Sequence, residues 1–224
     1  MAALRIAVIG LGHLGRVLVQ ELAALGVEVL AVDSDMENVE MVKDVATFAV
    51  RLDATDANAL RANRIDRMDA AVVTIGGNFE SLVLTIQELL LMGVTRIYAR
   101  ATSPTHRLIL ERLGIPNIIS PEEDAGRRLA QRLVNPGLLD FIELSKDYQI
   151  AEIECPVKFR AKTLAELELI RRYRVVVVTI RRFQEDGTSK IIGVPGPETL
   201  IEPSDTLIVL GMPTDIHRMV EQNA

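Results

Sequence analysis

Three glycines stand close together near the start of the chain: Gly10, Gly12 and Gly15, where an apolar run ends and a helical pattern begins. Glycines at this spacing allow a tight turn, a close approach of the backbone to a pyrophosphate, and close packing of a helix on a strand. The amides at the start of such a helix hold the phosphates. The segment therefore predicts a phosphate-binding loop, and a tight turn that holds no ligand is the alternative.

An acidic residue follows at the distance that a nucleotide site requires. Asp33 closes the next apolar run, near the offset of about 20 residues at which a carboxylate hydrogen-bonds a ribose. A helix cap for the following segment is the other interpretation of Asp33. Because carboxylates at Asp33 and Asp35 would repel the extra phosphate of NADP, the candidate ligands are NAD, ATP, ADP and AMP.

The groups that a hydride-transfer enzyme needs are not recognisable in the sequence. Such an enzyme requires a proton donor or base beside the substrate carbonyl, and no Tyr-x-x-x-Lys motif occurs. The three histidines are His13 in the glycine loop, His106 on a surface-type helix and His217 near the carboxyl end. They form no acid–base constellation, so we expect a binding protein and not an enzyme.

Composition excludes several classes of protein. The 224 residues are 49% hydrophobic and 25% charged, which is typical of a compact globular chain. A net charge of −6 argues against a protein that wraps nucleic acid. The single cysteine, Cys155, excludes an internal disulfide. Apolar stretches such as Ser81 to Gln87 are far shorter than the roughly 18 residues of a membrane span, and no export signal opens the chain, so we expect a cytoplasmic protein.

The first 120 residues alternate short β-branched runs with amphipathic helical patterns. This rhythm is typical of a parallel sheet covered by helices on both faces. The sequence thus predicts an α/β fold, a Rossmann-like doubly wound sheet of six strands. The predicted strands are Arg5–Ile9, Glu28–Asp33, Thr47–Leu52, Ala70–Ile75, Arg96–Ala101 and Asn117–Ile119.

The remaining residues predict a connecting helix and a small α+β domain. Pro121 and the acids after it suit the first turn of a helix that runs to Val134, and Asn-Pro-Gly at 135–137 interrupts it as a hinge. We expect a first domain at 1–134, a crossover segment at 135–144 and a second domain at 145–224. The predicted elements of the second domain are strands at 150–155, 175–183, 190–194 and 206–210, a helix at 163–172, a turn at 184–187, and a helix from 214.

Apolar residues in the connecting segments predict an interface. Ala125–Val134 and Leu138–Ile142 present more apolar surface than a lone subunit needs. We therefore expect subunits to pair and the pairs to close into a larger symmetric ring.

Taken in order, several motifs resemble those of a known family. They are the glycine loop, Ala31–Asp35, Asp53–Thr55, Ile75–Asn78 and the Pro-Glu-x-Asp element at 121–124. The chain resembles the RCK (KTN) regulatory subunits of potassium uptake systems, the KtrA, KtrC and TrkA family. The resemblance covers a nucleotide-binding RCK N-terminal domain and a small RCK C-terminal (TrkA-C) domain.

The resemblance implies a cytoplasmic ring, commonly an octamer built from dimers, docked beneath a membrane-embedded potassium transporter or channel subunit of the KtrB or TrkH kind. Nucleotide exchange reshapes such a ring and so gates the transporter. In Ktr-like members ATP favours the active state and ADP the inactive one, and TrkA-like members also bind NAD and NADH. A divalent cation such as Mg²⁺ is expected beside the phosphates.

Carried over residue by residue, the resemblance also implies a binding site. Gly10, Gly12 and Gly15 would line the phosphates, Asp33 and Asp35 would hold the ribose, and Asp53 with Ala54 would meet the adenine. Arg100 falls where a basic residue contacts phosphate, and Glu122 where a carboxylate helps hold the cation. The other residues expected at the nucleotide are His13, Leu14, Ser34, Thr55, Ile75, Gly76 and Asn78.

Two departures from the family pattern limit what the resemblance implies. His13 stands where many Ktr-like members have an arginine that reaches a terminal phosphate. Glu168 and Ile170 stand near positions where relatives that bind cyclic di-AMP often have Asn and Arg, so we assign no cyclic dinucleotide. The alternative functions are a small NAD-dependent oxidoreductase, which would need an acid–base pair, and a Rossmann-type redox-sensing repressor, which would need a basic helix-turn-helix.

Overall fold

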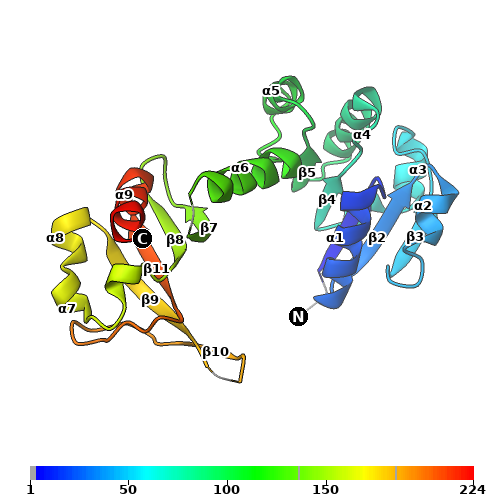
Figure 1. Ribbon diagram of the computed structural model, residues 1–224. Helices are drawn as coiled ribbons and strands as arrows, with labels where there is room; N and C mark the ends of the chain where they lie inside the picture. The colour runs from blue at the N-terminus through cyan, green and yellow to red at the C-terminus, as the bar shows by residue number, and fades with distance from the viewer. Residues whose placement is uncertain (1–3, 136, 185) are drawn as a thin grey trace. The chain divides into compact units, whose positions relative to one another are not determined.

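The structure is a computed structural model that describes residues 4–135, 137–184 and 186–224. The chain divides into two compact units, one ending at Glu122 and the other beginning at Glu123, each with its own sheet (Figure 1). Residue 136 of the predicted interruption and residue 185 of the predicted turn lie outside the described residues. Within those ranges we find no helix with both the length and the apolar character that a bilayer span needs.

The first unit contains one six-stranded sheet in the order β3-β2-β1-β4-β5-β6, and every neighbouring pair is parallel. This confirms the predicted Rossmann-like doubly wound fold. Each strand lies within the range expected from the sequence. The strands are β1 (Arg5–Ile9), β2 (Glu28–Asp33), β3 (Phe48–Arg51), β4 (Ala70–Val73), β5 (Ile97–Arg100) and β6 (Asn117–Ile119).

Helices cover both faces of this sheet because successive strand residues point to opposite sides. Ala7 and Ile9 of β1 belong to a core with α3, α4 and α5, whereas Val8 belongs to a core with α1 and α2. Ala7, Val8 and Ile9 are buried, so both cores exclude solvent where they contact β1, one of the two middle strands of the sheet. The helices are α1 (His13–Ala24), α2 (Met36–Glu40), α3 (Ala57–Ala62), α4 (Phe79–Leu91) and α5 (Pro104–Arg112).

The second unit contains an antiparallel sheet in the order β10-β9-β11-β8-β7. Its buried face packs against a cluster that includes Phe159, Leu167 and Met219. The apolar segment that follows the predicted hinge is strand β7, which pairs with β8. The elements are β7 (Leu138–Glu143), β8 (Gln149–Glu154), α7 (Leu164–Leu167), α8 (Leu169–Tyr173), β9 (Val176–Phe183), β10 (Ser189–Ile191), β11 (Asp205–Gly211) and α9 (Pro213–Asn223).

The single helix predicted over 163–172 is wrong, because the structure breaks it at Glu168. This residue adopts a left-handed conformation, with φ 46° and ψ 40°, between α7 and α8. Leu167 and Leu169 are both buried. In a continuous helix, residues two apart point about 200° away from each other, so one of the two leucines would face solvent. The turn at Glu168 lets both side chains enter the core.

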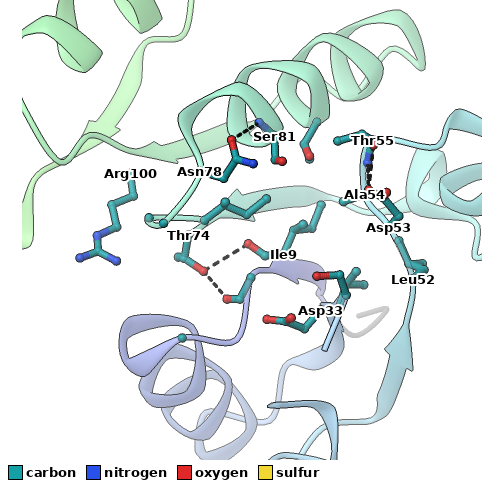
Figure 2. A pocket seen from close by; sticks show the side chains of 18 residues that line it. Ile9, Asp33, Leu52, Asp53, Ala54, Thr55, Thr74, Asn78, Ser81 and Arg100 are labelled. Atoms are coloured by element: carbon teal, nitrogen blue, oxygen red, sulfur yellow. Dashed lines mark hydrogen bonds between the residues drawn. The ribbon is translucent and has the colours of Figure 1, made fainter. Parts of the chain in front are cut away.

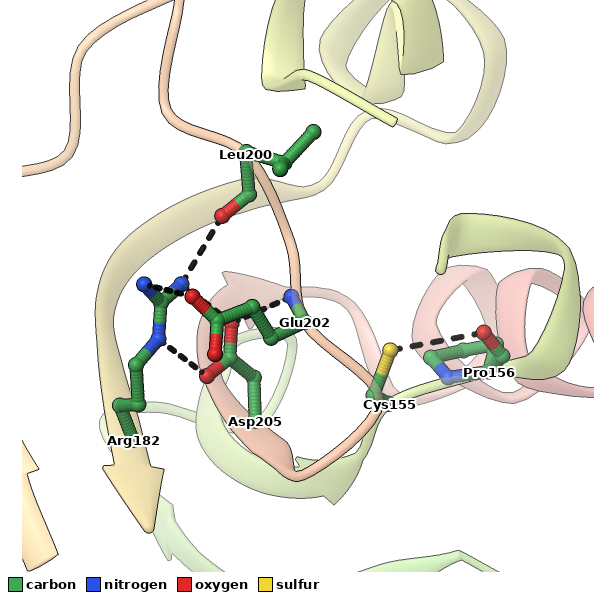
Figure 3. A network of polar contacts seen from close by, with 6 residues as sticks. All are labelled: Cys155, Pro156, Arg182, Leu200, Glu202 and Asp205. Atoms are coloured by element: carbon green, nitrogen blue, oxygen red, sulfur yellow. Dashed lines mark hydrogen bonds and ion pairs between the residues drawn. The ribbon is translucent and has the colours of Figure 1, made fainter. Parts of the chain in front are cut away.

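A buried carboxylate ties β9 to β11 in the second unit (Figure 3). The side chain of Asp205 is fully buried, and Arg182 donates to both of its oxygens at 2.8 Å. The same carboxylate accepts a hydrogen bond from the backbone N–H of Glu202 at 2.8 Å. This bonding with Asp205 raises the pKa of Arg182. The nearby Cys155 is buried, and desolvation raises the pKa of its thiol.

Helix α6 (Pro121–Val134) begins at the end of the first unit, and none of its residues is buried. Arg128 forms an ion pair with Asp140 of β7 at 2.7 Å, and Arg127 another with Glu143 at 3.6 Å. The division into compact units therefore places nearly all of α6 with the second sheet, whereas the sequence led us to end the first domain at 134. The boundaries at 134 and 144 stay a prediction.

Candidate functional site

A cavity of about 470 Å³ opens at the carboxyl edge of the parallel sheet (Figure 2). Ile9 ends β1 and Asp33 ends β2, while Thr74 follows β4 directly. The strand order reverses at β1, between β2 and β4. A doubly wound sheet leaves a ligand crevice at such a switch point, because the loops on its two sides lead away in opposite directions.

The glycine loop lies at one side of this cavity, and its glycines differ in what they do. Gly10 has φ +95°, and a Cβ there would lie 2.9 Å from the amide nitrogen of Ile75. A Cβ on Gly15 would lie 2.0 Å from the carbonyl oxygen of Gly10. Gly10 and Gly15 are therefore required by the fold itself, whether or not a ligand binds.

Gly12 is different, because a Cβ added there would meet no atom within 4 Å. Gly12 lines the cavity and forms the N-cap of α1 without a side-chain cap. The first turn of α1 contains no acid. The amides and the positive end of the helix dipole consequently face open space, as an anion site requires.

Asp33 holds the glycine loop against β2. Its Oδ2 accepts the backbone N–H of Leu11 at 2.6 Å, and its Oδ1 accepts the backbone N–H of Asp35 at 2.8 Å. A carboxylate has about four acceptor positions, so acceptors remain for a hydroxyl pair in the cavity. Asp33 thus combines a structural task with the capacity to bind a ribose.

Asp35 does not line the cavity, although the family resemblance implied that it would hold the ribose. Its Oδ1 accepts the backbone N–H of Glu37 at 2.9 Å and so caps α2. Ser34 does line the cavity. Its carbonyl oxygen accepts a hydrogen bond from Nε of Arg51 at 3.0 Å, which fixes the turn after β2.

The segment Asp53–Thr55 forms the wall beyond β3. Oδ1 of Asp53 accepts the backbone N–H of Thr55 at 2.9 Å and its hydroxyl at 2.8 Å. These two bonds, the backbone one foremost, lower the pKa of Asp53. Leu52 and Ala54 are buried, so this end of the cavity combines an apolar slot with an ionised carboxylate.

Arg100, at the end of β5, lines the opposite end of the cavity (Figure 2). Its guanidinium lies so close to Gly76 that a Cβ there would be 2.7 Å from a guanidinium nitrogen. Arg100 forms an ion pair with Glu122. The backbone N–H of Glu122 and then this guanidinium lower the pKa of the Glu122 carboxyl, although desolvation opposes them.

No cluster of three or more His, Cys, Asp or Glu side chains suited to a metal ion occurs in the described ranges. Glu122 would hold a cation only together with ligands from another source, such as phosphate oxygens, which suit hard cations. The donor chemistry at Glu122 thus fits a cation shared with a ligand and not a cage made by this chain.

The structure brings most of the predicted nucleotide residues to one cavity and leaves four outside its lining. Those that line it are Gly10, Gly12, Asp33, Ser34, Asp53, Ala54, Thr55, Ile75, Gly76, Asn78 and Arg100, and those that do not are His13, Leu14, Gly15 and Asp35. His13, Leu14 and Gly15 form the first turn of α1, where their backbone amides and not their side chains are the relevant groups.

Seven lining residues were missed by the sequence interpretation: Ile9, Val32, Leu52, Thr74, Gly77, Ser81 and Thr85. Thr74 donates its hydroxyl to the carbonyl oxygens of Ile9 and Gly10, which joins β4 to the glycine loop. Ser81 and Thr85 lie one helical turn apart on α4, after its cap Asn78. The four-residue spacing of these two hydroxyl residues was the one signal in the sequence that could have indicated a shared helix face, and such a spacing is too common to identify a site by itself.

Comparison with known families places two domains on the chain. Residues 6–121 match the TrkA-N domain and residues 154–223 match the TrkA-C domain. The chain is similar to the Ktr system potassium uptake protein C of Bacillus subtilis, with 34% identity over 95% of this chain and 94% of that protein.

Solved structures of similar fold include the RCK domain of GsuK, with a TM-score of 0.63 and 20% identity, which covers 100% of this chain and 48% of that one. The GsuK channel bound to NAD gives a TM-score of 0.61 and 18% identity, over 96% of this chain and 38% of that one. The chain thus spans less than half the length of these two solved chains, and at this identity the likeness concerns the fold.

Proposed function

This chain belongs to the family of TrkA-N/TrkA-C proteins that includes the Ktr potassium uptake proteins, and we propose that it is a nucleotide-sensing regulatory subunit of a potassium channel or transporter. The observation that carries the proposal is the cavity at the strand-order switch point. Gly12 and the free start of α1 lie on one side of it, and Asp33 and Asp53 lie further along it.

In this proposal an adenine nucleotide lies along the cavity. Its phosphates meet the amides at the start of α1, because that end is open and carries the positive helix dipole. Its ribose hydroxyls donate hydrogen bonds to the free acceptor positions of the Asp33 carboxylate, and its base lies in the apolar slot beside Ala54. Arg100 supplies a cation at the phosphate end.

ATP and ADP are the ligands that we propose, with NAD and NADH as the alternative. The GsuK channel has been solved with NAD, and a dinucleotide would require room beyond the glycine loop. The Asp33 carboxylate disfavours NADP, because a 2′-phosphate would approach it directly.

We further propose that Glu122 and a phosphate compete for Arg100. In the described conformation the guanidinium is paired with Glu122. A phosphate that binds Arg100 would free the Glu122 carboxylate, which would then be available to hold a magnesium ion together with phosphate oxygens. The ligand shifts the conformational equilibrium only by its different affinity for the two states, and this exchange of partners supplies such a difference.

The assembly that we propose is a dimer that closes into a ring, commonly an octamer, on the cytoplasmic side of a membrane-embedded potassium-conducting partner. Helix α6 buries none of its residues, and Leu129, Leu133 and Val134 are exposed on it. Exposed apolar stripes of this kind mark interfaces. Light scattering should give a mass well above one subunit at micromolar concentration, and a monomer with and without nucleotide would refute the assembly.

An oxidoreductase function has less support. No histidine, lysine, cysteine or tyrosine is among the described residues that line the cavity, and these are the usual proton donors and bases of hydride-transfer enzymes. Likewise, no observation favours a repressor, since the chain carries a net charge of −6.

Mass spectrometry of the nucleotide retained by the purified protein, followed by calorimetric titration with ATP, ADP and NAD, tests the proposal. We expect an adenine nucleotide to be retained and to bind with Kd in the micromolar range or below. Failure of all three nucleotides to bind would overturn it. Consumption of NADH with a carbonyl compound would instead establish an enzyme.

A further inference from the structure

Two hydroxyl groups on α4 lie at the cavity, and neither belongs to the nucleotide motifs of the sequence. Ser81 and Thr85 both line it. They are four residues apart, and residues at this spacing lie one above the other on the same face of a helix. The cap of α4 fixes this face, because Asn78 Oδ1 accepts the backbone N–H of Ser81 at 3.1 Å (Figure 2).

Thr85 is unusual among the lining residues. Its side chain is fully buried, and its Oγ1 has no hydrogen-bond partner. Buried hydroxyls are nearly always paired, because an unpaired one loses its bonds to water without replacement. A valine would fill the same space without that penalty. An unpaired hydroxyl in the wall of a ligand cavity therefore points to a partner that the ligand brings.

The position of Ser81 along the cavity indicates which part of a nucleotide this face of α4 meets. In Figure 2, Ser81 lies beside Asn78, between Arg100 at one end of the cavity and Thr55 and Ala54 at the other. Leu52 and Ala54 are buried apolar residues at the end of the cavity away from Arg100. A planar base suits such an apolar slot, and its hydrogen-bonding edge needs polar partners at the slot's wall.

We propose that Ser81 and Thr85 determine the base specificity of the site by hydrogen-bonding the edge of an adenine that carries the 6-amino group. This inference rests on the proposed function and extends it to the base. A hydroxyl both donates and accepts, so the pair can accept from the amine and donate to the neighbouring ring nitrogen. Oγ1 of Thr85 is covered by other atoms in this structure, so the cavity wall beside Thr85 must move locally when the base binds.

The test compares Thr85→Val, which removes the hydroxyl and keeps the shape, with Thr85→Ser, which keeps the hydroxyl. Each protein is titrated calorimetrically with ATP and with purine riboside triphosphate, which lacks the 6-amino group. We expect the valine variant to bind ATP about tenfold more weakly, the loss that one hydrogen bond represents. The serine variant should bind ATP nearly as the wild type does.

The comparison of ligands separates a hydrogen bond from a change of shape. The wild type should bind the ligand without the 6-amino group about tenfold more weakly than it binds ATP. Thr85→Val should bind the two ligands almost equally, because the hydroxyl that pairs with the amine is already absent. Ser81→Ala should show a reduced preference of the same kind. Thr179→Val, which removes another buried unpaired hydroxyl from the second unit, is the matched control and should leave both affinities unchanged.

The inference would be overturned if Thr85→Val and Ser81→Ala both kept the wild-type affinity for ATP and the wild-type preference for ATP over the ligand without the amine. The proposed function would then remain intact. A wild type that binds no adenine nucleotide would overturn both. Thermal unfolding of each variant shows whether it is folded, and we expect Thr85→Val to melt no lower than the wild type because it removes an unpaired polar group.

Discussion

Arg100 and Glu122 form an ion pair between the end of β5 and the first turn of α6. The sequence interpretation gave them separate tasks, Arg100 at the phosphates and Glu122 at a cation. We propose that the two tasks are linked, because a guanidinium that is paired with the carboxylate has fewer N–H groups free for a phosphate.

The first prediction concerns this link. In the wild type we expect magnesium to increase the affinity for ATP more than the affinity for ADP. In Glu122→Gln the carboxylate charge is lost, so this effect of magnesium on ATP binding should shrink. Without magnesium the variant should bind ATP slightly tighter, by less than about fivefold, because a partly exposed pair contributes about 0–1 kcal/mol. Calorimetry with and without magnesium measures both effects. Glu123→Gln, one residue along the chain, serves as the control, and an equal magnesium effect in all three proteins would remove Glu122 from the mechanism.

The second prediction is the pH dependence of this effect. The pKa of Glu122 is lowered by its own backbone N–H and then by Arg100. A carboxylate with a lowered pKa in the folded state contributes at all pH values above its unfolded pKa and loses its contribution as pH falls through the folded one. The Glu122-dependent part of the magnesium effect should therefore stay constant from about pH 6 to 8. A titration midpoint inside that window would show that another group controls the effect.

The third prediction separates Asp33 from Asp35. Asp33→Ala should weaken ATP, ADP or NAD by about 1.5–3 kcal/mol for each lost charge-assisted bond, and should also loosen the loop that the carboxylate holds at Leu11. Asp35→Ala removes only the cap of α2, which should reduce stability by about 1 kcal/mol and change affinity little. Titration calorimetry and thermal unfolding of both variants distinguish the two. Equal losses of affinity would mean that Asp35 reaches the ligand after all.

The fourth prediction uses two glycines of the same loop. Gly12→Ala adds a methyl group where no atom lies within 4 Å, whereas Gly15→Ala places one 2.0 Å from the carbonyl oxygen of Gly10. We expect Gly12→Ala to melt as the wild type does but to bind nucleotide at least tenfold more weakly, because its methyl group occupies the phosphate position. Gly15→Ala should lower the melting temperature of the first unit. Unweakened binding by Gly12→Ala would place the phosphates elsewhere.

The fifth prediction concerns the second unit. Asp205→Asn leaves Arg182 without its buried partner and should destabilise the unit by about 3 kcal/mol, while Glu202→Gln, whose side chain is 44% exposed, should cost less than about 1 kcal/mol. Hydrogen exchange of the amides in β9 and β11 measures the stability of this unit within the full chain. Similar protection in both variants would show that the Asp205 pair contributes little.

The sequence alone was sufficient for the features that depend on neighbouring residues. The six parallel strands appear as short β-branched runs, and the glycine loop and Asp33 stand at fixed offsets from the first of them, so the fold and one side of the cavity could be predicted. The resemblance then supplied Asp53–Thr55, Ile75–Asn78, Arg100 and Glu122. These signals survive in the sequence because strand periodicity and turn chemistry are local.

Only the tertiary structure decided which distant residues meet. Thr74, Ser81 and Thr85 carry no motif. Thr74 reaches the cavity because parallel strands bring their carboxyl ends to one edge, and Ser81 and Thr85 reach it because α4 packs on the sheet. The break at Glu168 was missed because helical propensity is local, whereas the need to bury both Leu167 and Leu169 arises only when the helix packs on its sheet. The ion pair of Arg100 with Glu122 likewise depends on where β5 ends relative to the start of α6. Contacts between residues far apart in sequence are set by packing, and no local pattern records them.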